Sequence, residues 1–567
     1  MKKDLSFLIC GEAGQGVQTV ELLLTKIFKE SGFNVFATKE YMSRVRGGSN
    51  SIEIRIASEK VRAPVYSVDI AILLDKGALG HVKKRLTDST VVLAEKETIG
   101  PADRAIVDVP LHKEAALIGG AIYANIIAVG VVAGIVGIDR QIVLDRVGLT
   151  FAGKAQDVVE KNHEAVRRGY ALAETMAASG AITKERFSSL TRGQPLHDQI
   201  LCNGAESIGL GALAGGCNFI SSYPMSPSTG VLVFLAQRTG TFNIIAEQAE
   251  DEIAAINMAI GAWYAGARAL VTTSGGGFAL MEEGVSLAAM LETPLVAHIA
   301  QRPGPATGLP TRTEQGDLEL VLYSGHGEFP RAIFAPGSVE DAFLCGHRAF
   351  YVADKYQIPV FILTDQYLMD SYYNCAPFSI SGGDAENHIV RTDAAYKRYR
   401  LADNGISPRG IPGYGDGLVL VDSDEHDEEG RITENMDVRN AMVEKRLKKL
   451  DLVIGESLGP ELIGSAGYKT LVICWGSTYP IVEEAIKRLG RDDIALLYFK
   501  QVYPLHKDTA GYIQKAKKTV LVENNATGQF GKLLKLTTGI DIKEKILKYD
   551  GLPFFVDELA GRLKGIV

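Results

Sequence analysis

Short apolar segments alternate with helical patterns along most of the chain, and this alternation predicts α/β structure. In the first third, residues 17–30 show the periodicity of an amphipathic helix. Around it lie apolar segments with the length and composition of strands, namely residues 5–10, 34–38, 51–56, 70–74 and 91–94. Strands, glycine-rich loops and helices in this order are typical of a mainly parallel sheet. We expect such a sheet in residues 1–182.

Two further α/β regions follow the same pattern. Residues 199–375 contain apolar segments that predict strands at 219–222, 244–247, 269–273, 295–300, 331–335 and 360–364. Residues 466–567 contain further ones at 470–477, 495–505 and 519–523. A polar stretch with Gly193 and Pro195 predicts a linker over 183–198, and residues 376–465 lose periodicity except for a helical run at 434–451. The predicted fold class is therefore α/β, with three regions and an irregular arm.

Composition and charge narrow the class of protein. At 567 residues the chain is too long for a single hydrophobic core. Its net charge of -8 gives a nucleic-acid role no electrostatic support. The apolar run 6–10 is too short for a signal peptide. The stretch 115–137 is interrupted by Tyr123 and Asn125, so we interpret it as a packed helix and not as a membrane span.

The six cysteines are scattered along the sequence. No two lie within ten residues of each other, so the spacing typical of zinc or iron–sulfur ligands is absent. Isolated cysteines in apolar runs are typical of a reduced, cytoplasmic protein. From these patterns we expect a cytoplasmic location, no metal site on this chain, and neither a membrane nor a nucleic-acid partner.

The most informative part of the chain is residues 220–317, where polar residues follow several predicted strands. It contains YPMSPST at 223–229, EQAEDEIAAINMAIGA at 247–262, TTSGGGF at 272–278 and QRPGPATGLPTRTEQGD at 301–317. Loops at strand ends carry the chemistry of α/β proteins. We therefore expect these segments to build one site from successive strand ends.

Glu252 lies on the apolar stripe of a predicted helix. Glu252, Ala255, Ile256, Ala259 and Ile260 share one helical face, whereas the preceding two acids lie off it. A carboxylate on such a face is costly unless it has a partner. One interpretation is a helix N-terminal charge favoured by the dipole. The other is a buried acid with a raised pKa that holds a nitrogen of a bound heterocycle.

The other segments contain hydroxyl groups, glycines that leave the backbone accessible, and an arginine. Consecutive glycines from Gly275, after Ser274, allow a ligand or a subunit to approach the backbone. Pro227 restrains Ser226, although the same residues fit a rigid turn with Ser228 or Thr229 as a helix cap. Arg302 after a buried strand is suited to clamp a carboxylate, or it forms a structural ion pair.

Two glycine-rich segments lie in the first region. GEAGQG at 11–16 follows a strand and precedes a helix, which suits an anion or partner contact. Its spacing is not that of a dinucleotide-binding loop, so a nicotinamide dehydrogenase is disfavoured. RVRGGSN at 44–50 predicts a hairpin-like turn or a second contact of this kind. The candidate residues for an anion, coenzyme A or subunit contact are Gly14, Gly16, Arg46, Gly47 and Gly48.

Taken together, the segments at 223–229, 248–262 and 304–317 resemble the 2-oxoacid:ferredoxin (acceptor) oxidoreductases. The resemblance is to the form in which the gamma unit is fused ahead of the alpha subunit, as in 2-oxoglutarate-type enzymes, and it covers nearly the whole chain. It implies a Rossmann-like gamma domain in 1–182, a thiamine-diphosphate pyrimidine-binding domain in 199–375 and a transketolase C-terminal-like domain in 466–567. VENNATGQ at 522–529 belongs to the last of these.

The resemblance also implies the chemistry. Family members use thiamine diphosphate to decarboxylate a 2-oxoacid oxidatively, pass the acyl group to coenzyme A and send electrons to ferredoxin. Glu252 falls at the glutamate that contacts the aminopyrimidine N1′ nitrogen, and Arg302 and Thr311 fall at positions that bind the substrate carboxylate. Ser226 replaces the threonine of the usual YPITP loop, keeping its hydroxyl. The resemblance places further cofactor contacts at Tyr223, Pro224, Ser274 and Gly275.

The family also needs a magnesium–diphosphate site and an iron–sulfur cluster. Gly415-Asp416-Gly417 resembles the start of the diphosphate motif, but an acidic run and a charged helix follow it, and the chain's Asn-Asn pair, Asn524-Asn525, lies far downstream. We therefore expect Mg²⁺ and a [4Fe-4S] cluster on a beta subunit, which would share the thiamine diphosphate. The alternatives are a non-catalytic assembly subunit and another thiamine-dependent enzyme such as an indolepyruvate oxidoreductase.

Overall fold

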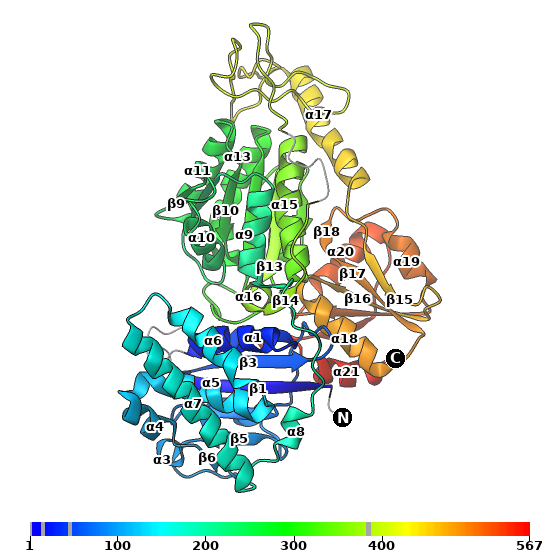
Figure 1. Cartoon of the computed structure of the whole chain (residues 1–567). Helices are drawn as coiled ribbons and strands as arrows, with labels where there is room; N and C mark the ends of the chain where they lie inside the picture. The colour runs from blue at the N-terminus through cyan, green and yellow to red at the C-terminus, as the bar shows by residue number, and fades with distance from the viewer. Residues whose placement is uncertain (1–2, 13–16, 43–47, 381–386) are drawn as a thin grey trace. The chain divides into compact units, whose positions relative to one another are not determined.

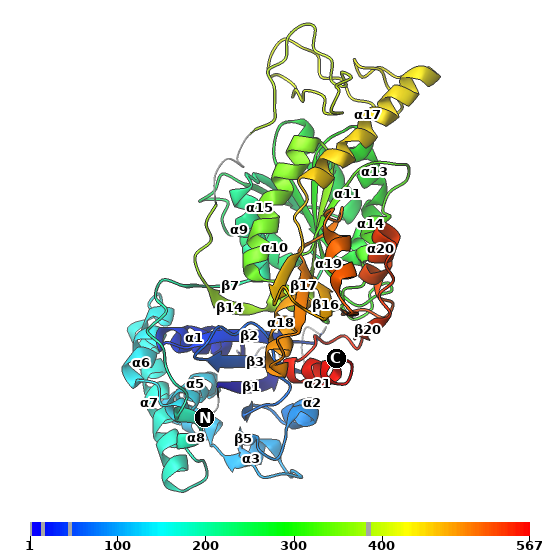
Figure 2. The same ribbon diagram turned by 90° about the vertical axis from the view of Figure 1, so that its right-hand side faces the viewer.

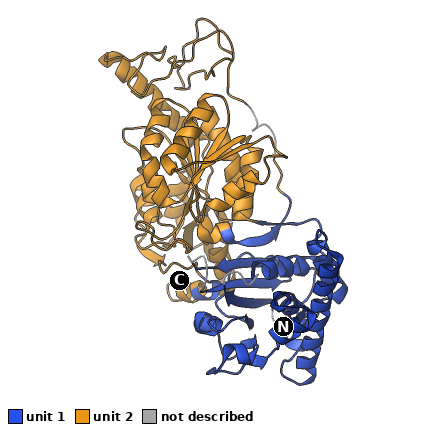
Figure 3. Ribbon diagram, turned by 90° about the vertical axis from the view of Figure 1, so that its left-hand side faces the viewer, with its two compact units in different colours: residues 1–202, 370–377, 555–558 blue, residues 203–369, 378–554, 559–567 orange. Residues whose placement is uncertain are grey.

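The computed structural model describes residues 3–12, 17–42, 48–380 and 387–567. It forms two compact units, which Figure 3 distinguishes by colour. Unit 1 comprises residues 1–202, 370–377 and 555–558, and unit 2 comprises residues 203–369, 378–554 and 559–567. Among the described residues, no helix is long and apolar enough to cross a membrane.

Unit 1 contains an eight-stranded mixed sheet in the order β6-β5-β4-β1-β3-β2-β14-β7 (Figure 1). Its strands are β1 (Asp4–Glu12), β2 (Asn34–Glu40), β3 (Ser49–Ala57), β4 (Ile70–Leu73), β5 (Val91–Ala94), β6 (Val107–Asp108), β7 (Ile200–Asn203) and β14 (Tyr372–Cys375). Its helices are α1 (Val17–Glu30), α2 (Ala78–Val82), η1 (Lys83–Arg85), α3 (Lys96–Ile99), α4 (Leu111–Ile118), η2 (Ala121–Tyr123), α5 (Ala124–Val136), α6 (Arg140–Phe151), α7 (Gln156–Ala178) and α8 (Glu185–Ser188).

The expectation of a mainly parallel sheet in this part of the chain is wrong. β1, β4, β5 and β6 are parallel, but β3 runs antiparallel to both β1 and β2, and β14 runs antiparallel to β2. Parallel neighbours need a crossover of about a dozen residues or more. Residues 41–48, which join β2 to β3, are too few for one, so the two strands pair antiparallel.

Strand β1 shows how the sheet of unit 1 is buried on both faces. Leu5, Phe7 and Ile9 pack into the core formed with α1, α5 and α7. Leu8 and Cys10 point to the other face, where they pack with residues of α2 and α3. Alternate residues of a strand face opposite sides, so a nearly continuous apolar run is required.

Unit 2 contains a seven-stranded sheet in the order β18-β12-β13-β11-β10-β8-β9. Its strands are β8 (Phe219–Ser222), β9 (Ile245–Gln248), β10 (Ala269–Thr273), β11 (Leu295–Gln301), β12 (Ala332–Phe334), β13 (Pro359–Asp365) and β18 (Gln501–Tyr503). The helices that accompany them are α9 (Gly204–Ala214), α10 (Thr229–Ala236), α11 (Glu252–Tyr264), α12 (Gly275–Phe278), η3 (Ala279–Met281), α13 (Glu282–Met290), α14 (Leu318–Leu322), α15 (Val339–Tyr356) and α16 (Gln366–Asp370). Helices α9 and α15 cover one face, and α11 and α13 the other (Figure 2).

The rest of unit 2 is the arm with its helix and a smaller sheet. α17 (Met436–Gly455) ends the arm, and the five strands have the order β15-β17-β16-β19-β20. Their bounds are β15 (Glu461–Gly464), β16 (Thr470–Trp475), β17 (Ile494–Phe499), β19 (Lys518–Glu523) and β20 (Glu544–Leu547), with η4 (Gly476–Thr478), α18 (Tyr479–Leu489), α19 (Thr509–Lys515), α20 (Gln529–Thr538) and α21 (Val556–Lys564). Both sheets of unit 2 contribute to one hydrophobic core.

Candidate active site

The polar segments predicted to form one site lie at one edge of the larger sheet in unit 2. β9, β8, β10 and β11 are consecutive in that sheet and parallel to one another. Their carboxyl ends therefore point the same way, and the segments that follow them begin at Tyr223, Ala249, Ser274 and Arg302. Crevices at the carboxyl ends of such strands are where open α/β sheets bind ligands.

Glu252 begins α11, and its side chain is buried. Asp251 caps the helix by accepting a hydrogen bond from the Ala254 N–H at 2.7 Å. The buried residues of α11 are those of the predicted stripe together with Trp263. Glu252 is only 4% exposed, and its Oε1 accepts no hydrogen bond from any described residue. A buried carboxylate oxygen without a donor is costly, so this position is suited to a ligand nitrogen.

The three glycines after β10 form a helical turn that packs against two carboxylates. A Cβ on Gly277 would lie 2.3 Å from Oγ1 of Thr273 and 2.7 Å from Oε1 of Glu252. A Cβ on Gly275 would lie 2.4 Å from both carboxylate oxygens of Asp317. Glycine is therefore required at these two positions because side chains of this same chain lie against the backbone there. Ser274, just before the turn, buries an Oγ that has no hydrogen-bond partner among the described residues.

Arg302 follows β11 and is half-buried beside the loop of β8. Its Nη1 donates to the carbonyl of Ser226 at 2.8 Å. This bond brings the predicted carboxylate clamp next to the predicted hydroxyl, although they are far apart in sequence. Burial lowers the pKa of Arg302, and the nearby Asp317 carboxylate opposes that shift. Ser228 is not a side-chain cap of α10, since its Oγ donates to the carbonyl of Met225.

The loop that carries Thr311 and Asp317 is held by the smaller sheet of unit 2. The Gln315 N–H donates to the carbonyl of Asn524 at 2.7 Å, and the Asn524 N–H donates to Oε1 of Gln315 at 2.9 Å. The Nε2 of Gln315 donates to the carbonyl of Trp475. Asn525 and Gln529 donate to the carbonyls of Gln315 and Gly316. The VENNATGQ segment therefore positions the loop, a role that local sequence pattern did not reveal.

Asp317 is a charged residue of the site that sequence reasoning missed. It was present in the TEQGD segment but carried no periodicity signal, because it lies in a loop just before α14. Its N–H donates to Oε1 of Gln301 at 2.9 Å. Its Oδ2 is buried without a partner among the described residues. Burial and the neighbouring Glu314 raise the pKa of Asp317 to about 7, against the effect of Arg302.

His298 ties together the strands beneath this edge. It lies in β11, with Nδ1 at 2.7 Å from Oγ1 of Thr272 in β10 and Nε2 at 2.8 Å from Oγ1 of Thr364 in β13. Burial lowers the pKa of His298 to about 3, so the ring is neutral at physiological pH. One ring nitrogen then donates and the other accepts. We assign His298 to the support of the site.

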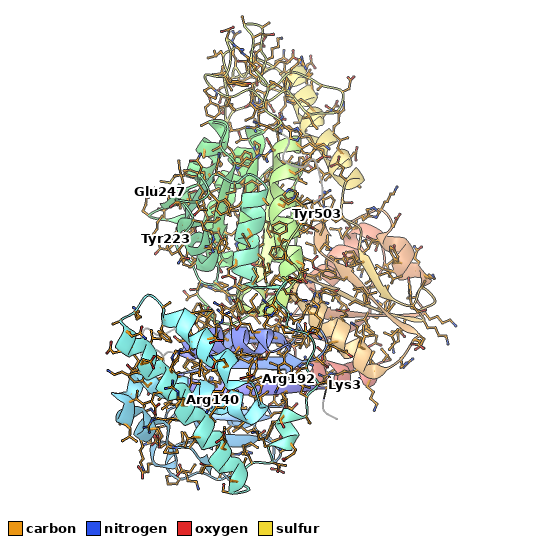
Figure 4. The ribbon with its side chains drawn as sticks, in the orientation of Figure 1. Lys3, Arg140, Arg192, Tyr223, Glu247 and Tyr503 are labelled. Atoms are coloured by element: carbon orange, nitrogen blue, oxygen red, sulfur yellow. The ribbon has the colours of Figure 1, made fainter. Side chains whose placement is uncertain are left out.

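The remaining candidate residues are exposed, half-buried or outside the described part of the chain. Tyr223 and Ser226 are exposed, whereas Pro224 and Thr311 are half-buried. Figure 4 shows Tyr223 on the side of unit 2 that carries Glu247. Gly48 has a φ of 84° and packs against the Met42 side chain. The other predicted glycine-loop residues, Gly14, Gly16, Arg46 and Gly47, lie outside the described residues. The roles assigned to all these residues stay predictions.

Comparison with known proteins identifies the family. Residues 210–445 match the model described as "Pyruvate flavodoxin/ferredoxin oxidoreductase, thiamine diP-bdg", and residues 6–172 match "Pyruvate ferredoxin/flavodoxin oxidoreductase". The 2-oxoacid:ferredoxin oxidoreductase subunit alpha of Saccharolobus solfataricus is 30% identical over 99% of this chain and 98% of its own length. Subunit alpha of 2-oxoacid:ferredoxin oxidoreductase 2 of Aeropyrum pernix is 30% identical over 100% and 98%.

A solved structure has the same fold throughout. The 2-oxoglutarate:ferredoxin oxidoreductase from Magnetococcus marinus, with 2-oxoglutarate, coenzyme A and succinyl-CoA bound, covers 100% of both chains with a TM-score of 0.92 and 29% identity. The predicted α/β class, with a thiamine-diphosphate-binding domain, is thereby confirmed. The chain belongs to the 2-oxoacid:ferredoxin oxidoreductases and corresponds to their alpha subunit, with the gamma part fused at its N-terminal end.

Proposed function

We propose that this chain supplies the pyrimidine-binding half of an active site that decarboxylates a 2-oxoacid oxidatively. The acyl group passes to coenzyme A and the electrons pass to ferredoxin. The observation that carries the proposal is the buried Glu252, whose Oε1 has no hydrogen-bond partner among the described residues. That oxygen lies at the carboxyl edge of the sheet, within a region that matches a thiamine-diphosphate-binding model.

The residues around Glu252 fit an aminopyrimidine ring. Ring nitrogens need a donor or acceptor in an otherwise apolar pocket, and Glu252 provides one such oxygen. Ser274 provides a second buried oxygen without a partner in the described chain. When bound, thiamine diphosphate would supply a nucleophilic carbon for the 2-oxo group and a cationic ring that accepts the electron pair left by loss of CO₂. Glu252 would hold a proton at the ring nitrogen and so favour the tautomer that ionises the reactive carbon.

The substrate carboxylate would bind at Arg302, with hydroxyls from Thr311 and Ser226 completing the contact. The guanidinium is oriented by its bond to the Ser226 carbonyl and keeps further N–H groups for an anion. We propose 2-oxoglutarate or a similar 2-oxoacid as the substrate. The full-length match to a 2-oxoglutarate enzyme and to 2-oxoacid enzymes supports this class.

A beta subunit would complete the site and carry Mg²⁺, the diphosphate contacts and the iron–sulfur cluster. The edge strand β9 and the helices beside Glu252 expose several large apolar side chains to solvent. These are Tyr223, Val233, Phe242, Ile245, Ile253 and Met258, with exposed fractions between 37% and 63%. Exposed large apolar side chains gathered on these elements favour a protein interface there. The scattered cysteines support the proposal that the cluster ligands belong to another chain.

Glu252→Gln tests the proposed function in the complex reconstituted with a beta subunit. The amide cannot transfer the proton, so exchange of the cofactor's reactive C–H with deuterated water should slow by roughly 10²–10⁴-fold. Magnetic resonance of the acid-quenched cofactor measures this rate. Glu250→Gln is the matched control, because Glu250 is exposed two residues earlier. Wild-type exchange in the Glu252 variant would remove the assignment.

A further inference from the structure

Asp317 lies where the substrate-binding arginine and the glycine turn meet. It follows β11 by sixteen residues in sequence, yet its N–H is bonded to Gln301 at the end of that strand. Its carboxylate packs on Gly275, where a Cβ would be 2.4 Å from both oxygens. Gly275 thus leaves room for the Asp317 carboxylate, and the hydrogen bond to Gln301 fixes the Asp317 backbone beside it.

The surroundings of Asp317 disfavour its negative charge. Oδ2 is buried and receives no hydrogen bond from the described residues. The charged groups that act on it are Glu314, on the same loop, and Arg302, which follows β11. Gly275 from α12 and Gln301 from β11 face it without charge. Burial removes water from an anion in this position, and among the described residues Arg302 is the cation that offsets the repulsion from Glu314.

We propose that Asp317 is a positioning residue that takes up a proton when a 2-oxoacid carboxylate binds Arg302. This inference rests on the proposed function. The proton moves from solvent to the Asp317 carboxylate, and no bond of the substrate changes. Once Asp317 is neutral, Arg302 keeps its full charge for the substrate, and one negative charge near the incoming anion is removed.

Proton uptake by Asp317 makes substrate binding depend on pH in a defined direction. Burial and, to a smaller extent, Glu314 raise the pKa of Asp317 to about 7, and Arg302 opposes this increase. Below that pH the residue is already protonated, and the carboxylate binds without proton uptake. Above it, each molecule bound requires one proton, so substrate affinity falls by about tenfold per pH unit. Glu314 matters because its charge contributes to the raised pKa.

The kinetic test compares pH profiles of KM for 2-oxoglutarate in the reconstituted complex. The wild type should show KM rising above neutral pH, while Asp317→Asn should keep a low, flat KM. Glu314→Gln should move the rise to lower pH. Glu319→Gln is the control: Glu319 is another acid on the same segment, but it pairs with Lys532 at the surface. A pH-dependent KM that persists in Asp317→Asn would overturn the proposal.

A second readout keeps this inference separable from the proposed function. The infrared difference spectrum of wild type minus Asp317→Asn should show the C=O band of a protonated carboxylic acid that disappears as pH rises through neutrality. The difference is needed because burial also raises the pKa of Glu21 to about 7 and of Asp365 to about 6, and both acids contribute equally to the two spectra. If the band titrates but the complex fails to turn over any 2-oxoacid, the proposed function fails and Asp317 remains a protonated site residue. If the difference spectrum contains no such band, the proton-uptake proposal fails whatever the activity.

Discussion

Glu252, Ser274 and Asp317 each bury a side-chain oxygen that no described residue of this chain satisfies. An unsatisfied buried polar group costs about 1–3 kcal/mol. Three such groups lie in segments that follow neighbouring parallel strands. Three such groups at one sheet edge favour a binding site over an incidental packing defect, because one bound ligand could form hydrogen bonds with all three.

Gly277→Ala should disturb this site and the fold together. The added methyl would lie 2.3 Å from Oγ1 of Thr273 and 2.7 Å from Oε1 of Glu252, so either the turn or the carboxylate must move. Overpacking of this kind costs about 1–3 kcal/mol. Thermal unfolding should show a lower Tm, and the reconstituted complex should bind thiamine diphosphate less tightly.

The neighbouring glycine provides the control for that substitution. A Cβ on Gly276 would meet only the Ala306 carbonyl oxygen, at 3.7 Å. Gly276→Ala should therefore leave the Tm at or above the wild-type value. Equal Tm values for the two alanine variants would show that the close contacts at Gly277 do not constrain the turn.

At the scale of elements, the 522–529 segment and α17 contact loops at opposite ends of the larger sheet in unit 2. The VENNATGQ segment at the end of β19 fixes the loop that bears Thr311 and Asp317. At the opposite end of the sheet, α17 docks onto the turn before β11 through a buried ion-pair cluster. Lys445 and Lys449 contact the two oxygens of Glu292 at 2.6 and 2.5 Å, with all three side chains nearly inaccessible. The arm is thus an integral part of unit 2.

Glu292→Gln should weaken this docking strongly. The substitution leaves two buried ammonium groups without their shared counter-ion, and removal of one partner from a buried pair costs about 3–5 kcal/mol. Urea unfolding should show the loss, and limited proteolysis should cut the arm faster. Glu444→Gln, at an exposed position of the same helix, should match the wild type in both assays. An unchanged unfolding midpoint for Glu292→Gln would contradict the importance of the cluster.

At the scale of the whole molecule, the proposed site would need a partner to complete it. Glu252, Arg302 and the glycine turn all belong to unit 2, and so do the exposed apolar side chains Val233 and Ile253 of α10 and α11. The apolar surface predicts that a partner subunit covers this side. On that basis the isolated chain should bind thiamine diphosphate with Mg²⁺ weakly or not at all.

Ile253→Lys tests the proposed contact with the partner. Ile253 is 51% exposed on α11, next to Glu252, so a lysine there should not disturb folding. It should lower the affinity for the beta subunit, measured by calorimetry, by at least 10-fold. Leu418→Lys, at a 77% exposed position of the arm, is the matched control. Equal affinities for both variants would place the partner on another surface, and tight cofactor binding by the isolated chain would contradict the shared site.

Local sequence pattern was sufficient to predict those strands and helices whose own residues carry the strand composition or the helical periodicity. β8 and β10 have the predicted bounds, and the buried stripe of α11 includes Glu252 as expected. These features depend on strand composition and helical periodicity, which a short window records. The family resemblance added the expected roles of Glu252, Arg302 and Thr311, which stay predictions.

Features that depend on pairing between distant residues emerged only from the folded chain. β14 joins the sheet of unit 1 although it follows the helices of unit 2, and β3 reverses the expected strand direction. The Gln315–Asn524 contact joins residues more than two hundred positions apart. The position of the Asp317 carboxylate against Gly275 makes it a candidate site residue, and this contact depends on the folded chain. Burial and electrostatics are properties of the assembled environment, and no local window of sequence contains that environment.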